Sequence, residues 1–322
     1  MEAYGQSGPD DRWGKGVKLR ISDCGHRGLG PLRIGIKAIT SIFVLLSVGF
    51  AFAAQDQQID KKLAALEKLP SKFSFVVFGD NRAGDPACDA VYQKVVAAAM
   101  ERKPDFVMNT GDLVNTPGNI QDWAKFWEMS KPVTVPYFLT VGNHDIHPRV
   151  KGSEQIYKEQ VDLPGNELYY SFRAGNSLFI VLDTNLDDAE KKITGEQLTW
   201  LEGVLSKGTQ KHIFVFVHHP LFPDPGKGKH HGNSLDRYPK ERDALQVLLV
   251  KNKVTMVFTG HEHLYLRKTI GNIPHVIAGG GGAPLYGKDD EGGFYHFVVV
   301  TVDGDRVGAE VIDLNGKVRD SF

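Results

Sequence analysis

Short apolar segments alternate with amphipathic segments over most of the chain, and this alternation predicts its secondary structure. Runs rich in β-branched and aromatic residues cover 72–80, 104–112 and 135–145, and each of them predicts a strand that ends in a polar turn. Between the first two runs, apolar residues recur at helical spacing across 87–103. The first half of the pattern therefore reads strand, helix, strand, strand.

The second half continues the alternation and then changes to strands alone. Residues 169–185 alternate polar and apolar positions and break at Gly175-Asn176, which predicts a β-hairpin. The elements that follow are expected in this order: helix 194–207, strand 212–220, helix 238–252 and strand 254–263. The remainder is mostly β and contains a second hairpin at Asp303-Gly304. Strand–helix alternation followed by strands alone predicts an α/β fold with more than one sheet.

The first 53 residues do not fit this pattern. Residues 1–33 are polar, rich in glycine and without periodicity, so we expect them to be disordered or to reflect an over-called translation start. Residues 34–53 contain an apolar stretch behind a positive flank and end in an A-x-A site, which predicts a signal peptide cleaved after Ala53. A membrane anchor formed by residues 34–54 is the alternative, because about 20 apolar residues span a bilayer.

Cleavage after Ala53 would release the mature protein into the periplasm or the medium, with no stable membrane insertion. It would remove 7 basic and 4 acidic side chains from totals of 38 and 39, and leave a net charge of −4. We therefore expect no nucleic-acid partner, since no basic field favours one. The mature chain would keep only one of the two cysteines, Cys88, so a metal site would have to be built from His, Asp, Asn and Glu.

Polar side chains of the kind that bind metals follow five of the predicted strands. They are Asp80, Asp112, Asn143 with His144, His218 with His219, and His261 with His263. Each motif alone is an ordinary strand end, because Gly-Asp and Gly-Asn sequences form good turns. In open α/β sheets, however, ligands bind at the carboxyl ends of strands, where loops from separate strands meet. The five motifs together therefore predict a shared metal site.

The ordered set Gly-Asp, Gly-Asp, Gly-Asn-His-Asp, His-x-Pro and Gly-His-x-His resembles the calcineurin-like metallophosphoesterases. That family includes purple acid phosphatases and cyclic-nucleotide phosphodiesterases. The resemblance runs from about Phe73 to His263, and we assign residues 72–318 to one metallophosphoesterase domain. It implies a four-layer α/β/β/α sandwich of two mixed β-sheets, with a site that holds two metal ions.

The resemblance also implies which residues hold the ions. Asp112 would be the bridging carboxylate, and one ion would be bound by Asp80, Asp112 and His263. The other ion would be bound by Asp112, the side-chain oxygen of Asn143, His218 and His261. These donors suit Fe, Mn or Zn, and the sequence does not choose among them.

By the same resemblance, metal-bound hydroxide would attack phosphorus, and both ions would stabilise charge on the phosphoryl oxygens. His144 would protonate the leaving oxygen as general acid and would be oriented by Asp145. The chain is thus expected to be an exported, dinuclear metal-dependent phosphoesterase that hydrolyses small phosphate mono- or diesters. The sequence leaves the substrate and the oligomeric state open.

Two positions depart from the family pattern. Many members read Asp-x-His at the first motif, with that histidine as a further ligand, whereas this chain has Arg82 there. Purple acid phosphatases use a tyrosine three residues after the bridging aspartate, where this chain has Asn115. Water, Asn115 or the substrate would then complete the first ion. Arg82 stays protonated, so we expect it either to grip a substrate phosphate or to pair with Asp85.

Two further features bear on substrate binding. His219 is expected to shape the site or to contact phosphate. The polar segment 223–241 follows the His218 motif and is either a substrate-facing lid or a flexible loop. Because the first ion lacks a strong ligand, a phosphate-binding relative that is weak or inactive in catalysis is the alternative function.

Overall fold

A computed structural model of the chain describes residues 59–322. The predicted segments 1–33 and 34–53 lie outside these residues. Within the described part of the chain, no helix has the length and apolar character needed to span a membrane.

The first of two six-stranded sheets joins the beginning and the end of the described chain. Its strands are β1 (Lys72–Phe78), β2 (Phe106–Asn109), β3 (Tyr137–Leu139), β10 (His296–Asp303), β11 (Arg306–Asp313) and β12 (Val318–Ser321). They are ordered β12-β11-β10-β1-β2-β3. β1, β2 and β3 are parallel, whereas β10 runs antiparallel to β1 and is followed by antiparallel β11 and β12. The sheet is therefore mixed, and the carboxyl ends of β1–β3 lie at one edge.

The second sheet is built from the middle of the chain. Its strands are β4 (Tyr170–Ala174), β5 (Ser177–Leu182), β6 (His212–Val217), β7 (Met256–Thr259), β8 (Tyr265–Ile270) and β9 (Ile273–Ala278). They are ordered β4-β5-β6-β7-β9-β8. β5, β6, β7 and β9 are parallel, and the two edge strands, β4 and β8, are antiparallel to their neighbours. This sheet is also mixed, with β6 and β7 in its centre.

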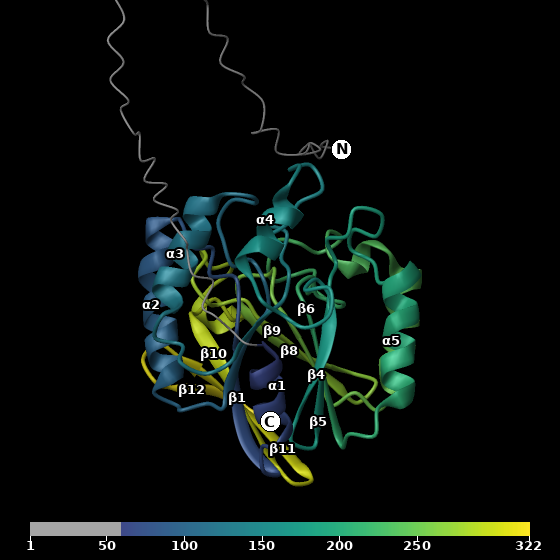
Figure 1. The fold of residues 1–322 in the computed structure, drawn as a ribbon. Helices are drawn as coiled ribbons and strands as arrows, with labels where there is room; N and C mark the ends of the chain where they lie inside the picture. The colour runs from purple at the N-terminus through teal and green to yellow at the C-terminus, as the bar shows by residue number, and fades with distance from the viewer. Residues whose placement is uncertain (1–58) are drawn as a thin grey trace, which may run out of the picture. The chain divides into compact units, whose positions relative to one another are not determined.

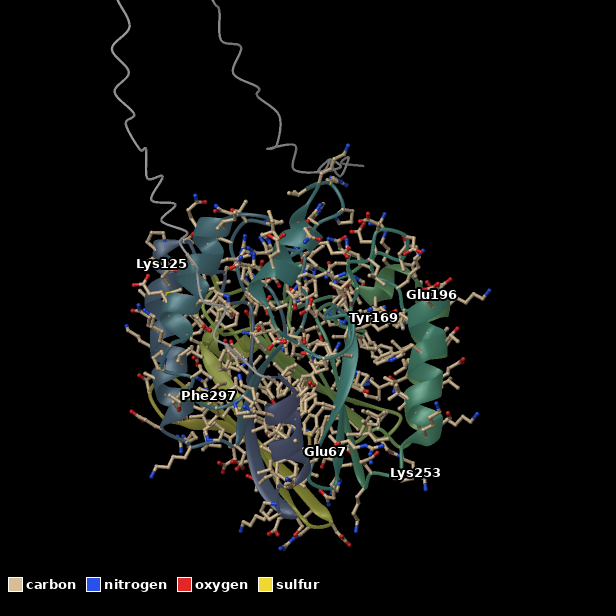
Figure 2. The ribbon with its side chains drawn as sticks, in the orientation of Figure 1. Glu67, Lys125, Tyr169, Glu196, Lys253 and Phe297 are labelled. Carbon is tan, nitrogen blue, oxygen red and sulfur yellow. The ribbon has the colours of Figure 1, made fainter. Side chains whose placement is uncertain are left out.

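The helices are α1 (Ile59–Glu67), α2 (Pro86–Met100), α3 (Ile120–Ser130), α4 (Ser153–Gln160), α5 (Gly195–Lys207) and α6 (Pro239–Lys251), with short 3-10 turns at Leu235–Arg237 and Asp289–Glu291. α2 and α3 cover the outer face of the first sheet, and α5 and α6 cover that of the second. α1 lies against the edge strand β4, and α4 packs on α3. Figure 1 shows α2 and α3 together on one side and α5 on the opposite side. The charged side chains of Lys125 on α3 and Glu196 on α5 lie at these two outer surfaces (Figure 2).

An aromatic core joins the two sheets face to face. The ring of Phe75 on β1 lies 5.1 Å from those of Phe179 on β5 and Phe214 on β6. The opposite face of β1 carries Phe78, whose ring lies 6.1 Å from that of Tyr92 on α2. Because strand side chains alternate between faces, each sheet packs on the other sheet with one face and on helices with the other. This is the predicted four-layer α/β/β/α sandwich of two mixed sheets.

The structure confirms the predicted strands and hairpins, with shorter bounds, and it adds helices that the pattern did not predict. The strand expected over 135–145 is confined to Tyr137–Leu139, because the chain then turns into the strand-end loop. α1, α3 and α4 were not predicted. α3 is amphipathic and begins at the cap Asn119, whose side chain accepts from the backbone N–H of Gln121 at 3.0 Å.

Candidate metal centre

The polar motifs follow the carboxyl ends of five strands of the two sheets. Asp80, Asp112 and Asn143 come after β1, β2 and β3, and His218 and His261 come after β6 and β7. Each residue follows its strand by at most four positions. Because the sheets pack face to face, loops from both of them meet at this end of the sandwich.

The backbone at these strand ends adopts a conformation that side chains disfavour. φ is positive at Asp80 (58°), Arg82 (49°), Asp112 (55°) and His261 (68°), which are four of the nine non-glycine residues with positive φ in the described chain. Such left-handed residues cost free energy and persist only where the surrounding structure enforces them. The concentration of this strain in three of the five loops marks them as a candidate functional site.

Two glycines allow the loops to approach the carboxylates closely. A side chain on Gly260 would overlap the carboxylate of Asp80, and one on Gly142 would overlap that of Asp112. Neither position tolerates a Cβ, so each glycine is required by packing against an acidic side chain.

Asp80, Asp112 and His263 form one buried cluster, and their ligand atoms lie within 4.8 Å of one another. The Nδ1 atom of His263 lies 2.8 Å from the carbonyl oxygen of Pro284, which can only accept, so Nδ1 carries the proton. The unprotonated Nε2 then faces an oxygen of Asp80 at 3.7 Å. The backbone N–H of His261 donates to both oxygens of Asp80 and orients that carboxylate.

His218 faces Asp112 and Asn143 in a second cluster. Its Nδ1 donates to the carbonyl oxygen of Thr110 at 2.9 Å, which leaves Nε2 with a lone pair. Nε2 lies 3.3 Å from an oxygen of Asp112 and 3.1 Å from the side-chain oxygen of Asn143. Three acceptor atoms thus face one another, and this arrangement is repulsive unless a cation lies between them. The residues present therefore fit a metal ion.

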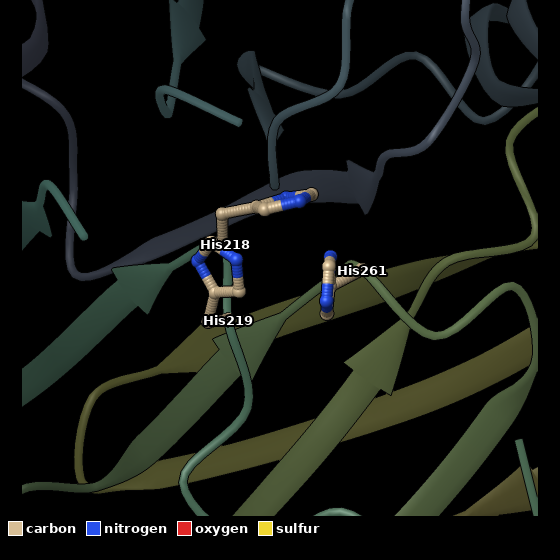
Figure 3. Close-up of side chains that lie close together, drawn as sticks. All are labelled: His218, His219 and His261. Carbon is tan, nitrogen blue, oxygen red and sulfur yellow. The ribbon is translucent and has the colours of Figure 1, made fainter. Parts of the chain in front are cut away.

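His219 lies inside the site and not at its mouth. It is fully buried, its Nδ1 bonds the hydroxyl of Thr184 at 2.7 Å, and its Nε2 has no hydrogen-bond partner among the described residues. Its ligand atom lies within 4.8 Å of those of His218 and His261, and Figure 3 shows these three side chains lying close together. A side chain at this depth is better placed to support the metal cluster than to contact substrate directly.

A cation beside the two buried aspartates would allow both of them to ionise. Burial and the negative charge of Asp112 raise the pKa of Asp80 well above its usual range. Burial acts in the same direction on Asp112, but His218, His144 and Arg82 outweigh it and hold the pKa of Asp112 below its usual value. Two carboxylates this close ionise together only when positive charge lies beside them, which divalent ions supply.

The histidines of the clusters are held in the neutral form that binds metals. Burial lowers the pKa of His218, lowers those of His219 and His261 well below the usual range, and lowers that of His263 to about 3. A neutral imidazole offers a lone pair, and carboxylate, amide and imidazole donors together suit Fe, Mn and Zn.

His144 and Arg82 stand together beside Asp112. The Nδ1 atom of His144 lies 2.7 Å from the carbonyl oxygen of Asn115 and 3.0 Å from Nη2 of Arg82. Because a carbonyl only accepts, Nδ1 donates to Asn115 and cannot also accept from Arg82, so Arg82 lies beside His144 as a neighbour and not as a hydrogen-bond partner. The Nε atom of Arg82 is buried without a hydrogen-bond partner in the described chain. Asn115 contributes its backbone carbonyl to His144. Nε2 of His144 is the ring nitrogen left for a ligand.

The predicted role of Asp145 in orienting His144 is wrong. The buried carboxylate of Asp145 accepts hydrogen bonds from the backbone N–H groups of Gly142 (2.8 Å), Leu113 (2.7 Å) and Val114 (3.1 Å). Asp145 therefore ties the loop after β3 to the loop after β2. It stabilises the backbone that presents Asp112 and Asn143, while the carbonyl of Asn115 orients His144.

We expect Asp145→Ala to lower the free energy of unfolding by at least about 3 kcal/mol. The change leaves three buried N–H groups without an acceptor, and each costs about 1–3 kcal/mol. Urea denaturation measures the loss. Asp145→Asn keeps one acceptor oxygen and should lose less. An Asp145→Ala protein within about 1 kcal/mol of the parent would contradict this role.

The segment 223–241 lies partly over the metal centre, which favours the lid over the flexible loop. The ring centre of His230 lies 4.1 Å from that of His261. His231 is exposed and faces Asp236 instead. Tyr286, which sequence analysis missed, stacks on His263 with ring centres 4.3 Å apart. Its position after the glycine-rich run 279–282 was the available signal.

The family model of the calcineurin-like phosphoesterases matches residues 73–265, more than half of the chain. The chain belongs to this family. The match begins in β1 and ends just after the Gly-His-x-His motif, so it contains all five strand-end motifs.

Two curated relatives are purple acid phosphatases of Arabidopsis thaliana. Purple acid phosphatase 23 is 31% identical over 45% of this chain and 32% of its own length. A second relative, named Probable inactive purple acid phosphatase 9, is 26% identical over 61% of this chain and 36% of its own length. The chain thus spans about a third of the length of these two relatives.

A solved structure has the same fold. The purple acid phosphatase PPD1 from yellow lupin superposes with a TM-score of 0.67 at 23% identity, covering 79% of this chain and 54% of that one. At this identity the likeness supports the fold alone, the two-sheet metallophosphoesterase sandwich.

Proposed function

We propose that the chain is a dinuclear metal-dependent phosphoesterase that hydrolyses small phosphate mono- or diesters. The observation that carries the proposal is the convergence of buried acceptor atoms around Asp112, with one cluster toward Asp80 and the other toward His218. Two ions bound there would activate a water molecule and offset charge on the phosphoryl oxygens.

The proposed ligand sets are the two clusters, with His261 added to the second because its ligand atom lies within 4.8 Å of that of His218. Asp80, Asp112 and His263 would hold the first ion, and Asp112, Asn143, His218 and His261 the second. The backbone carbonyls of Pro284 and Thr110 fix the tautomers of His263 and His218, so that Nε2 of each ring is the donor. Fe, Mn and Zn all remain consistent with these donors.

Arg82 would bind the phosphate ester, and His144 would protonate its leaving oxygen. The guanidinium of Arg82, whose Nε–H has no partner among residues 59–322, is suited to bind a phosphoryl oxygen. His144, whose Nδ1 is occupied by the carbonyl of Asn115, would deliver a proton from Nε2 to the leaving oxygen. Nη2 of Arg82 lies 3.0 Å from Nδ1 of His144, so recognition and proton transfer would take place side by side.

The purified protein should hydrolyse p-nitrophenyl phosphate or bis-p-nitrophenyl phosphate. Activity should fall to background after EDTA treatment and return on addition of Mn²⁺, Zn²⁺ or Fe²⁺, because the ligand sets hold exchangeable ions. Metal analysis should find two ions per chain. A panel of mono- and diesters would then identify the substrate class.

Loss of catalysis is the other outcome of this experiment. The replacement of a family ligand by Arg82 and the name of one relative motivate it. A metal-loaded protein that hydrolyses no mono- or diester across the pH range, yet binds inorganic phosphate, would overturn the enzyme and support a phosphate-binding role.

Export forms part of the proposal and rests on the apolar segment before Ala53. We expect the mature chain to begin at Ala54 and to be found free in the periplasm or the medium. Mass spectrometry of the amino terminus checks this. Detection of an intact 37–54 segment in the membrane fraction would favour the anchor.

A further inference from the structure

Glu262, the residue between the two histidines of the Gly-His-x-His motif, is buried and binds the segment that covers them. The residue is 1% exposed. Its two carboxylate oxygens accept from the backbone N–H groups of Lys229 and His230, each at 2.7 Å. Both bonds are charge-assisted, and each uses a different oxygen, so the carboxylate fixes the position and the orientation of this backbone.

The contact with Glu262 requires glycine at position 228. Its φ is +82°, and a Cβ on it would overlap the carboxylate of Glu262. Residues 228–230, here named the clamp segment, therefore depend on Glu262 for two hydrogen bonds and on glycine for the close approach. Burial raises the pKa of Glu262, and the two amide bonds act against that rise.

The clamp segment places two side chains over the metal centre. The ring of His230 lies against that of His261, with 4.1 Å between centres, and the ammonium of Lys229 lies 4.2 Å from the ring centre of Tyr286. Tyr286 in turn stacks on His263. The side chains of His230, Lys229 and Tyr286 thus cover His261 and His263, the two histidines on either side of Glu262. Glu262 holds the backbone of Lys229 and His230 in place by its two hydrogen bonds.

We propose that Glu262 is a positioning residue: it holds the clamp segment so that Lys229 and His230 form a wall of the substrate site. It neither binds metal nor touches substrate. Its effect on substrate affinity rests on the proposed phosphoesterase function, whereas its effect on the order of the clamp segment does not.

The test compares Glu262→Gln with the parent in two measurements. Hydrogen exchange, followed by mass spectrometry on peptides that cover Lys229 and His230 and end at residue 231, should be about ten-fold or more faster in the variant, because glutamine keeps one acceptor and turns an N–H toward the other amide. KM for p-nitrophenyl phosphate should rise about ten-fold, while kcat and the metal content stay within about two-fold of the parent.

Asp236→Asn is the matched control. Asp236 also accepts from two backbone N–H groups of the same insert, Gly232 at 2.6 Å and Ser234 at 3.1 Å, and its side chain is only 7% exposed, but it does not bind the clamp segment. Its variant should leave KM and the exchange of Lys229 and His230 near the parent values.

Gly228→Ala tests the same contact from the loop side without changing the metal-binding motif, and it keeps the test open if Glu262→Gln does not fold. It should reproduce the faster exchange and the higher KM. Unchanged exchange in both variants would overturn the proposal, as would loss of metal from a folded Glu262→Gln protein. If exchange is faster in the variants but the parent protein hydrolyses no ester, the role of Glu262 in ordering the clamp segment would stand and the proposed phosphoesterase function would be rejected.

Discussion

Asp112→Asn should remove both metal ions and lower kcat/KM by roughly 10⁴-fold or more. Asp112 is the one carboxylate that belongs to both clusters, close to Asp80 and His263 on one side and 3.3 Å from Nε2 of His218 on the other. An amide keeps the shape but loses the negative charge that offsets two cations. Metal analysis after dialysis and steady-state kinetics measure the two losses.

Asp85→Asn is the control for this change. Asp85 is also an aspartate in a strand-end loop, but its carboxylate caps α2 by accepting from the backbone N–H of Ala87. This variant should keep two ions and the activity of the parent. If Asp112→Asn retained both ions, Asp112 would not be the bridge, and the assignment of the two ligand sets would be wrong.

The fold could be predicted because its elements are encoded locally. The strand β1 is an apolar run that ends in Gly-Asp, and the hairpin between β4 and β5 is marked by Gly175-Asn176. α3 was missed because its cap, Asn119, lies in a stretch that reads as loop. Its helical state is stabilised by packing of Trp123 and Phe126 in the core, which the local pattern does not show.

The side chains of the candidate site could be predicted from the sequence, but the hydrogen bonds that orient them could not. Strand-end position was enough to expect Asp80, Asp112 and His218 at one place. The groups that orient them are backbone atoms distant in sequence, such as the carbonyl oxygen of Thr110, 108 residues before His218. No residue type encodes such a contact, because every residue has a carbonyl.

Adjacency in sequence misled the interpretation of Asp145 for the same reason. Next to His144 it looked like the partner of that imidazole. In the fold, its side chain turns to backbone amides of the neighbouring loop, which need an acceptor once they are buried. For Glu262, in contrast, the sequence predicted no role. It lies between two predicted ligands, and only the fold reveals that it is buried and binds residues 229 and 230.

His144→Ala should lower kcat by about 10²–10⁴-fold, the range typical of a lost general acid, and leave the metal content near two ions. The backbone N–H of His144 donates to Asp112 at 2.9 Å, and this bond survives the substitution. The imidazole itself is held through Nδ1 by the carbonyl of Asn115, which leaves Nε2 to serve the leaving oxygen.

The leaving group distinguishes this role from simple positioning of phosphate. Because a good leaving group departs without a proton, the loss in His144→Ala should shrink from alkyl phosphates to p-nitrophenyl phosphate. His147→Ala, in the same loop, is the matched control and should stay within about two-fold of the parent, since Nδ1 of His147 accepts from the backbone N–H of Arg149 at 3.1 Å and its contacts with Ser153 are made by backbone atoms, which alanine keeps. An equal loss for poor and good leaving groups would assign His144 to phosphate binding, and metal depletion would make it part of the metal centre.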